Sequence, residues 1–149
     1  MGDNNNSTPL SSSEYKGVGE IIYDRVCAYE SLPEGLIVDY QGLNGINHLG
    51  FMTAPGGKFT KRFVTGGFEA QLPFQIFYKT APTNNSNSFD AESFVDDLAD
   101  WLEKKPYPDL TDDRQILQIV MDSITYTSTA DNDGSVVYVR SGSVIYQKG

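Results

Sequence analysis

The chain has 149 residues, one cysteine and a net charge of −9, with 20 acidic residues against 11 lysines and arginines. The length favours one domain with its own core, and a single cysteine excludes an intramolecular disulfide. Because duplex DNA is bound by cations placed against phosphates, the acidic balance disfavours a domain that reads DNA sequence. No run of eighteen apolar residues is present, so no membrane-spanning segment is expected.

The first thirteen residues are small and polar, and they lack the basic and apolar regions of a secretory signal. We expect a disordered arm over residues 1–13 and a single folded domain over residues 14–149. Within residues 12–29, apolar side chains repeat at the helical period. This pattern predicts a helix, and its apolar stripe favours packing against the core over binding a partner.

Residues 36–40 predict a short strand, residues 42–48 a loop and residues 50–53 a further strand. The clearest strand signal follows in residues 68–78, where apolar and polar side chains alternate. Such alternation is typical of a strand that lies on a core with its other face toward water.

A basic stretch precedes that strand, and two glycines separate them. Residues 61–64 predict a partner strand, because Gly66 and Gly67 suit the turn of a hairpin. Pro73 lies within the alternating strand and has no backbone N–H to donate. It therefore predicts a position at a sheet edge or in a bulge.

A second helix is predicted after a polar loop at residues 81–88. Asp90 is the expected N-cap, Trp101 is expected on the apolar stripe, and Pro106 is expected to stop the helix. If Trp101 faces the core, Trp101→Ala should be among the most damaging changes.

Residues 115–129 form a β-prone run, and a turn at residues 130–134 leads into a last strand over residues 135–147. Gly142 is expected to form a bulge in that strand. Strands and helices are segregated along the chain. The sequence therefore predicts an α+β fold, a mainly antiparallel sheet with two helices packed on one face.

The sequence gives little sign of catalytic chemistry. His48, the only histidine, lies in a glycine- and asparagine-rich loop without the companions that a metal site or a catalytic triad needs. The stretch from Asp131 to Gly134 lacks the spacing of a calcium loop and is typical of a turn. These patterns predict a protein that is not an enzyme and uses no metal or cofactor.

The stretch KRFVTGGFEAQLPFQIFYK, followed by FDAESFVDDLADWLEK and two closing strands, resembles the small minor capsid proteins of tailed bacteriophages. These proteins are related to tail terminators. The resemblance runs from about Tyr15 to the end of the chain. Thr65 stands where this family usually has an aspartate before the double glycine.

The resemblance implies a structural virion protein of the tail or neck, assembled in the bacterial cytoplasm as a homo-hexameric ring. Such a ring stops tail-tube polymerisation and joins the tail to the head connector, so its partners are itself, the tail tube protein and the connector or stopper. Phage DNA passes through the lumen without sequence-specific binding. An acidic wall is compatible with that passage, because it would not trap phosphates.

On this hypothesis, an extended edge such as residues 58–64 would add to a neighbour's sheet. The loops at 42–48, 83–88 and 130–134 would supply further contacts. The candidate subunit-interface residues are Lys58, Lys61, Arg62, Phe63, Asn44, Asn47, His48, Asn85, Asp131 and Asp133. Two alternatives stay open: a head-completion or stopper protein on the capsid side, and an enzyme or ligand-binding domain whose site is assembled from scattered residues.

Overall fold

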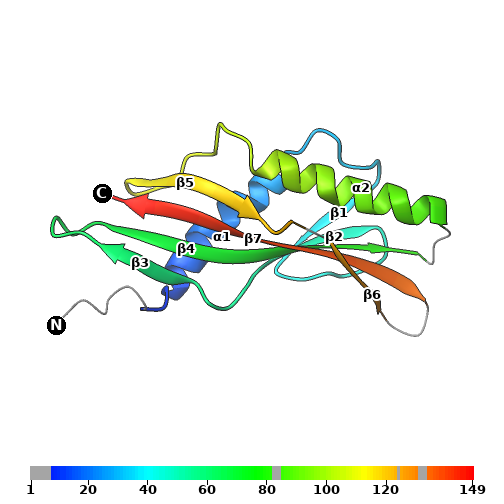
Figure 1. Cartoon of the computed structure of the whole chain (residues 1–149), viewed down its shortest axis with the longest axis horizontal. Helices are drawn as coiled ribbons and strands as arrows, with labels where there is room; N and C mark the ends of the chain where they lie inside the picture. Colours follow the sequence, from blue (N-terminus) through cyan, green and yellow to red (C-terminus); the bar gives the residue numbers. More distant parts are fainter. Residues whose placement is uncertain (1–7, 82–84, 124, 131–133) are drawn as a thin grey trace.

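A computed structural model describes residues 8–81, 85–123, 125–130 and 134–149. Within these residues, two helices and seven strands follow one another along the chain (Figure 1). They are α1 (Ser12–Cys27), β1 (Ile37–Tyr40), β2 (His48–Thr53), β3 (Lys58–Arg62), β4 (Phe68–Thr80), α2 (Asn85–Leu102), β5 (Arg114–Met121), β6 (Tyr126–Ala130) and β7 (Ser135–Lys148).

Two long strands form the axis of the sheet. β4 and β7 pair antiparallel from Phe68 opposite Lys148 to Thr80 opposite Val136. Each long strand carries two short strands on its other side, β3 and β2 on β4, and β5 and β6 on β7. β1 extends the sheet beyond β2 as its parallel neighbour. The described sheet is therefore mainly antiparallel, as the sequence predicts.

Both helices cover the same face of this sheet. Along β4, alternate side chains from Phe68 to Ile76 are buried, and those between them are half-buried. The buried face packs against α1 and α2, which also touch each other. This arrangement confirms the predicted α+β fold and the alternation on which the prediction rested.

α1 begins where Ser11 accepts a hydrogen bond from the backbone N–H of Glu14 at 3.4 Å. Its buried apolar side chains are Val18, Ile22 and Val26, spaced at the helical period as expected. Residues 8–13 of the expected arm are ordered, because residues 8–10 lie along β3, Leu10 is buried, and α1 with its N-cap begins at Ser11. Residues 1–7 lie outside the described part of the chain.

α2 differs from its prediction at the start. The helix begins at Asn85, so Asp90 lies inside it and is not the N-cap. Trp101 is half-buried and packs against Tyr29, with ring centroids 5.1 Å apart and ring planes tilted by 42°. Because Trp101 does not enter the core fully, Trp101→Ala should cost less than the sequence alone suggested.

Pro73 does not lie at an edge or in a bulge, because β4 is a central strand. Its carbonyl accepts from Ala54 N–H at 2.9 Å, on the side where the neighbour of β4 changes from β3 to β2. The backbone atoms of one residue point to the same side of a strand, so the missing N–H faces this junction and costs no bond to β7.

Gly142 does not form a bulge either. It pairs with Phe74 on one side and Met121 on the other without a register shift. The irregularity lies in β5, between Ile116 and Gln118. The predicted run over residues 115–129 is divided into β5 and β6, which pair with opposite halves of β7.

Candidate assembly interface

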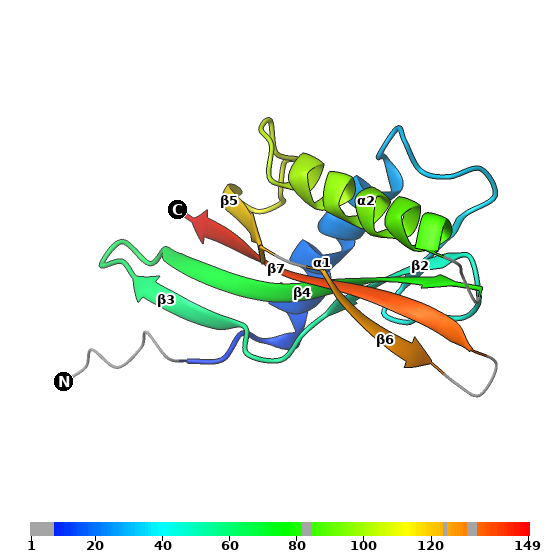
Figure 2. The same ribbon diagram turned by 45° about the vertical axis from the view of Figure 1, so that its right-hand side comes forward.

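The hairpin that joins β3 to β4 carries four of the candidate interface residues. Lys58, Lys61, Arg62 and Phe63 all lie on this hairpin and are all exposed. Figure 2 shows that it extends at one end of the sheet, beyond the helices. Val64 at the tip is fully exposed, and Phe63 is 38% exposed. The hairpin therefore presents apolar side chains beside positive charges.

Hydrogen bonds and close packing fix the turn of this hairpin. Phe63 N–H donates to Gly67 O at 2.9 Å, and Gly66 adopts a positive φ of 97°, which suits glycine. A Cβ on Gly67 would overlap the backbone oxygen of Lys148, so the turn lies directly against the last strand. The guanidinium of Arg62 lies 4.1 Å from the centre of the Phe59 ring.

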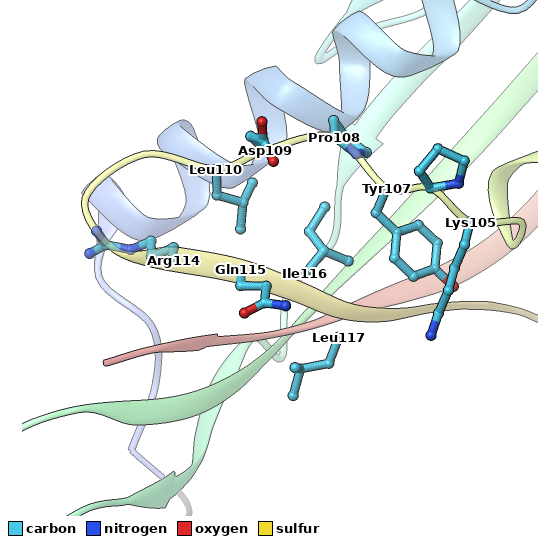
Figure 3. Close-up of a pocket in the computed structure, with 10 residues that line it drawn as sticks. Lys105, Tyr107, Pro108, Asp109, Leu110, Arg114, Gln115, Ile116 and Leu117 are labelled. Carbon is cyan, nitrogen blue, oxygen red and sulfur yellow. The ribbon is translucent and has the colours of Figure 1, made fainter.

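A groove lies along β5, which is on the opposite side of the β4–β7 pair from β3. It separates the first half of β5 from the loop at residues 105–110 and has a volume of about 840 Å³. Figure 3 shows Leu110 and Ile116 pointing toward one another across this space, whereas Leu117 points to the other side of the strand. Ile116 is buried, and Tyr107, Leu110 and Leu117 are half-buried.

The strand beside the groove has an open edge. β5 pairs with β7 on one side, and among the described residues no strand pairs with its other side. No backbone hydrogen bond joins the fully described loop at 105–110 to this edge. The edge is occupied at its two ends, where Arg114 N–H donates to Thr111 O at 3.2 Å and Met121 N–H donates to a Glu103 carboxylate oxygen at 2.8 Å. An open edge of this kind can accept an additional strand.

Arg25 holds the outer wall of the groove. Its guanidinium donates to the carbonyls of Lys104 at 2.6 Å and Pro106 at 3.1 Å, and it also reaches two carbonyls at the end of α2. The same group lies 4.6 Å from the centre of the Trp101 ring. A cation suits the C-terminus of a helix, so α1 fixes both the end of α2 and the loop that follows.

The inner wall is held by a buried carboxylate. Glu14 on α1 accepts from Arg114 Nε at 3.0 Å, from Arg114 Nη2, and from the Tyr146 hydroxyl at 2.8 Å. Burial would raise the pKa of Glu14, but the hydrogen bonds from Arg114 and Tyr146 outweigh burial and lower it. Burial, followed by the bond to Glu14, raises the pKa of Tyr146 well above its ordinary range.

Charges are distributed unevenly around the groove. Asp109, Asp112 and Asp113 are exposed in the segment that leads into β5. Lys105 lies at the other end of the loop, and the charge of Arg114 is neutralised by Glu14. The entrance beside the start of β5 is therefore acidic.

Asn44 and Asn47 lie in the loop before β2, and His48 is the first residue of that strand. His48 Nδ1 lies 2.8 Å from a carboxylate oxygen of Asp39, and the same oxygen accepts from Asn44 N–H at 2.8 Å. Asn47 has a positive φ of 63°, and its N–H donates to Lys79 O at 2.7 Å. Burial would raise the pKa of Asp39, but the bonds from Asn44 and His48 lower it.

The candidate residues thus separate into two groups. The loop before β2 pairs with the C-terminal end of β4, whereas the hairpin is at its N-terminal end. Arg62 pairs with Phe68 and His48 pairs with Lys79, and at about 3.3 Å a residue these positions lie about 36 Å apart along β4. Asn85 begins α2, but its side chain lies outside the described part of the structure, as do Asp131 and Asp133.

The groove and its supports were missed by the sequence analysis. Glu14 and Arg114 are 100 positions apart, and Glu14 and Tyr146 are 132 apart, so no local pattern joins them. The signal that was available is the exposed acidic cluster before a β-prone run.

In the described part of the chain, no three His, Cys, Asp or Glu side chains gather closely enough to hold a metal ion. None of the described helices is long and apolar enough to cross a membrane. No known family model matches the sequence, and the search of curated proteins found no similar protein.

Proposed function

We propose that this protein is a structural virion protein, a tail terminator that caps the tail tube of a bacteriophage as a ring. In this role it stops tube polymerisation and joins the tail to the head connector. The proposal rests on the resemblance carried by residues 61–79, and one structural observation supports it. Among the four edge strands of the described sheet, which are β1, β3, β5 and β6, two present unlike surfaces: β3 with its basic hairpin and β5 with its groove.

Unlike edges matter because they determine the symmetry of assembly. When one edge of a copy contacts the other edge of the next copy, the contact is head-to-tail. Such contacts form a ring when the rotation from copy to copy closes and an open filament when it does not. Two-fold dimers instead require one patch that is complementary to itself. The proposed assembly is a ring of six copies, the number that the resemblance implies.

A ring of this kind must also let DNA pass. The outward face of α2 carries exposed carboxylates, which are Asp90, Glu92, Asp97 and Asp100. A surface of like charge does not bind phosphates, so this face is suited to the lumen of the ring. The proposed partners are other copies of the chain, the tail tube protein, the connector or stopper and the passing DNA.

Electron microscopy of particles from a phage that lacks this gene tests the proposal. Overlong tails beside separate full heads are expected, because nothing would stop the tube from growing. Normal-length tails beside heads that have lost their DNA would move the protein to the capsid side of the neck. Infectious particles of ordinary appearance would contradict a role in virion assembly.

A further inference from the structure

We infer that the groove along β5 receives the β3–β4 hairpin of a second copy of this chain, which adds to β5 as an extra strand. This inference rests on the proposed function, because it names the contact through which the copies would form their ring. The occupant is residues 60–65: residues 60–62 belong to β3 and would pair with β5, and the turn at 63–65 would carry Phe63 and Val64 into the groove. The acceptor is the open edge of β5 opposite the loop at 105–110.

The shape of the groove favours an extended chain. One wall is a strand edge without a strand partner, and the opposite wall makes no backbone hydrogen bond to it. An inserted strand would therefore gain main-chain hydrogen bonds to β5, the usual source of affinity when a strand is added to a sheet. The volume of about 840 Å³ leaves room for backbone as well as side chains.

The hairpin carries exposed apolar side chains that match the apolar floor of the groove. Val64 is fully exposed and Phe63 is 38% exposed, at the tip of a hairpin that lies beyond the helices (Figure 1). The floor of the groove is apolar at Ile116, with Leu110 facing it. Burying Phe63 and Val64 there would remove from water the most exposed apolar group of the hairpin.

The charges of the two surfaces are complementary. Lys58, Lys61 and Arg62 lie within five residues on β3. Asp109 lines the groove, and Asp112 and Asp113 are exposed in the turn that leads into β5. Opposite charges at the rim of an interface accelerate association and reject wrong partners. In the same chain β3 and β5 lie on opposite sides of the β4–β7 pair, so one hairpin contacts the groove of a different copy.

Charge reversal in purified protein tests this contact. Lys61→Glu with Arg62→Glu makes the hairpin acidic, and Asp109→Lys with Asp112→Asn and Asp113→Asn makes the groove basic. Asparagine is used at the last two positions because both aspartates have a positive φ, which asparagine tolerates. Sedimentation velocity over a concentration series should show at least about tenfold weaker self-association for each variant alone.

The two variants mixed together supply the sharper result. The acidic hairpin of the first variant fits the basic groove of the second. The unchanged basic hairpin of the second variant fits the unchanged groove of the first. Association should therefore return in the mixture, as an assembly in which the two variants alternate. Native mass spectrometry with one variant isotopically labelled would measure that alternation.

Matched controls separate this contact from general charge effects. Lys16→Glu with Lys104→Glu changes the net charge as the hairpin variant does, and Asp97→Lys with Asp100→Lys changes it as the groove variant does. All four residues are exposed and lie outside both surfaces. These controls should associate like the unmodified chain, and thermal unfolding should show that every variant is folded.

Three results would overturn the inference: an unmodified chain that stays monomeric at its solubility limit, reversed variants that associate normally, or a mixture that fails to recover. Weakening by the groove variant alone would reject the hairpin as the occupant and assign the groove to another segment of the neighbouring copy. The phage deletion remains a separate measurement. Overlong tails together with normal association of the reversed variants would keep the tail-terminator role and reject this contact.

Discussion

Single buried charges determine where the elements of this protein lie. Glu14 joins α1 to β5 and β7 through Arg114 and Tyr146, and Arg140 joins β7 to α2 through Asp96 at 2.6 Å. Glu14 and Arg140 are 8% and 7% exposed. A buried charge that loses its partner is costly, so each position should tolerate few substitutions.

Glu14→Gln should lower the free energy of unfolding by about 3 kcal/mol at pH 7, because it removes the buried anion of the Arg114 guanidinium and leaves only the exposed Asp112 carboxylate, 3.8 Å away. Urea unfolding followed by circular dichroism measures this difference. Glu20→Gln, on the exposed face of the same helix, is the control and should change stability little. Equal effects of the two substitutions would contradict the role given to Glu14.

The difference in stability between the unmodified chain and Glu14→Gln should depend on pH. The pKa of Glu14 is lowered in the fold, so its carboxylate stabilises the protein fully above the ordinary value of 4.5. That contribution is lost as the pH falls through the lowered value. The stability difference between the unmodified chain and Glu14→Gln should therefore narrow below pH 4.5, and a difference that widened there would reverse the sign of this argument.

Arg25 has a more local effect, on the outer wall of the groove. Arg25→Met should destabilise the fold by about 2 kcal/mol, because charged hydrogen bonds to the carbonyls of Lys104 and Pro106 are lost. Amide hydrogen exchange should then become faster in residues 103–110 than elsewhere. Lys16→Met, on an exposed part of α1, is the matched control. Uniformly faster exchange would show that Arg25 stabilises the whole fold without positioning the loop.

At the scale of elements, the close contact of β5 with β7 depends on the absence of a side chain at Gly142. A Cβ there would overlap the Met121 sulfur and lie 2.9 Å from Val120 O. Gly142→Ala should therefore cost about 1–3 kcal/mol in the free energy of unfolding, as overpacking usually does. Chemical denaturation measures this cost.

The control for Gly142 is a glycine in open space. Gly17 lies on α1, and a Cβ there would meet nothing within 4 Å. Gly17→Ala should stabilise the helix by up to about 1 kcal/mol, because alanine has the better helix propensity. A stabilising Gly142→Ala would mean that β5 moves away from β7 easily.

The elements themselves were predictable where one periodicity dominated. The alternation along β4 and the stripe on α1 gave both elements nearly at their observed bounds. Asp90 was misassigned because a good capping residue can also lie inside a helix when the chain becomes helical earlier. Pro73 was misassigned because a sequence does not show that the neighbour of a central strand changes at that residue.

The groove could not be predicted for a different reason. It depends on two walls that are held by Arg25 and Glu14, and both of their partners lie far away in the sequence. The hairpin was predictable, because its charges, glycines and apolar tip are contiguous. Local sequence therefore indicated one side of the proposed contact, and only the fold provided the other.

At the scale of the whole molecule, unlike surfaces on opposite sides of a long two-stranded axis make this protein suited to head-to-tail assembly. If opposite charges guide that assembly, its strength must depend on salt. The screening length is about 10 Å at 0.1 M ionic strength and about 3 Å at 1 M. Self-association measured by sedimentation velocity should therefore weaken as sodium chloride is raised over this range.

A neutral hairpin isolates the charge contribution. Lys61→Gln with Arg62→Gln should associate more weakly at 0.1 M salt and lose most of its dependence on salt, because rim charges act through long-range attraction. Val64→Ser should show the opposite behaviour, with weaker binding at every salt concentration and an unchanged slope. Association of the unmodified chain that strengthens with salt would mean that burial of Phe63 and Val64 dominates the contact and that the charges contribute little.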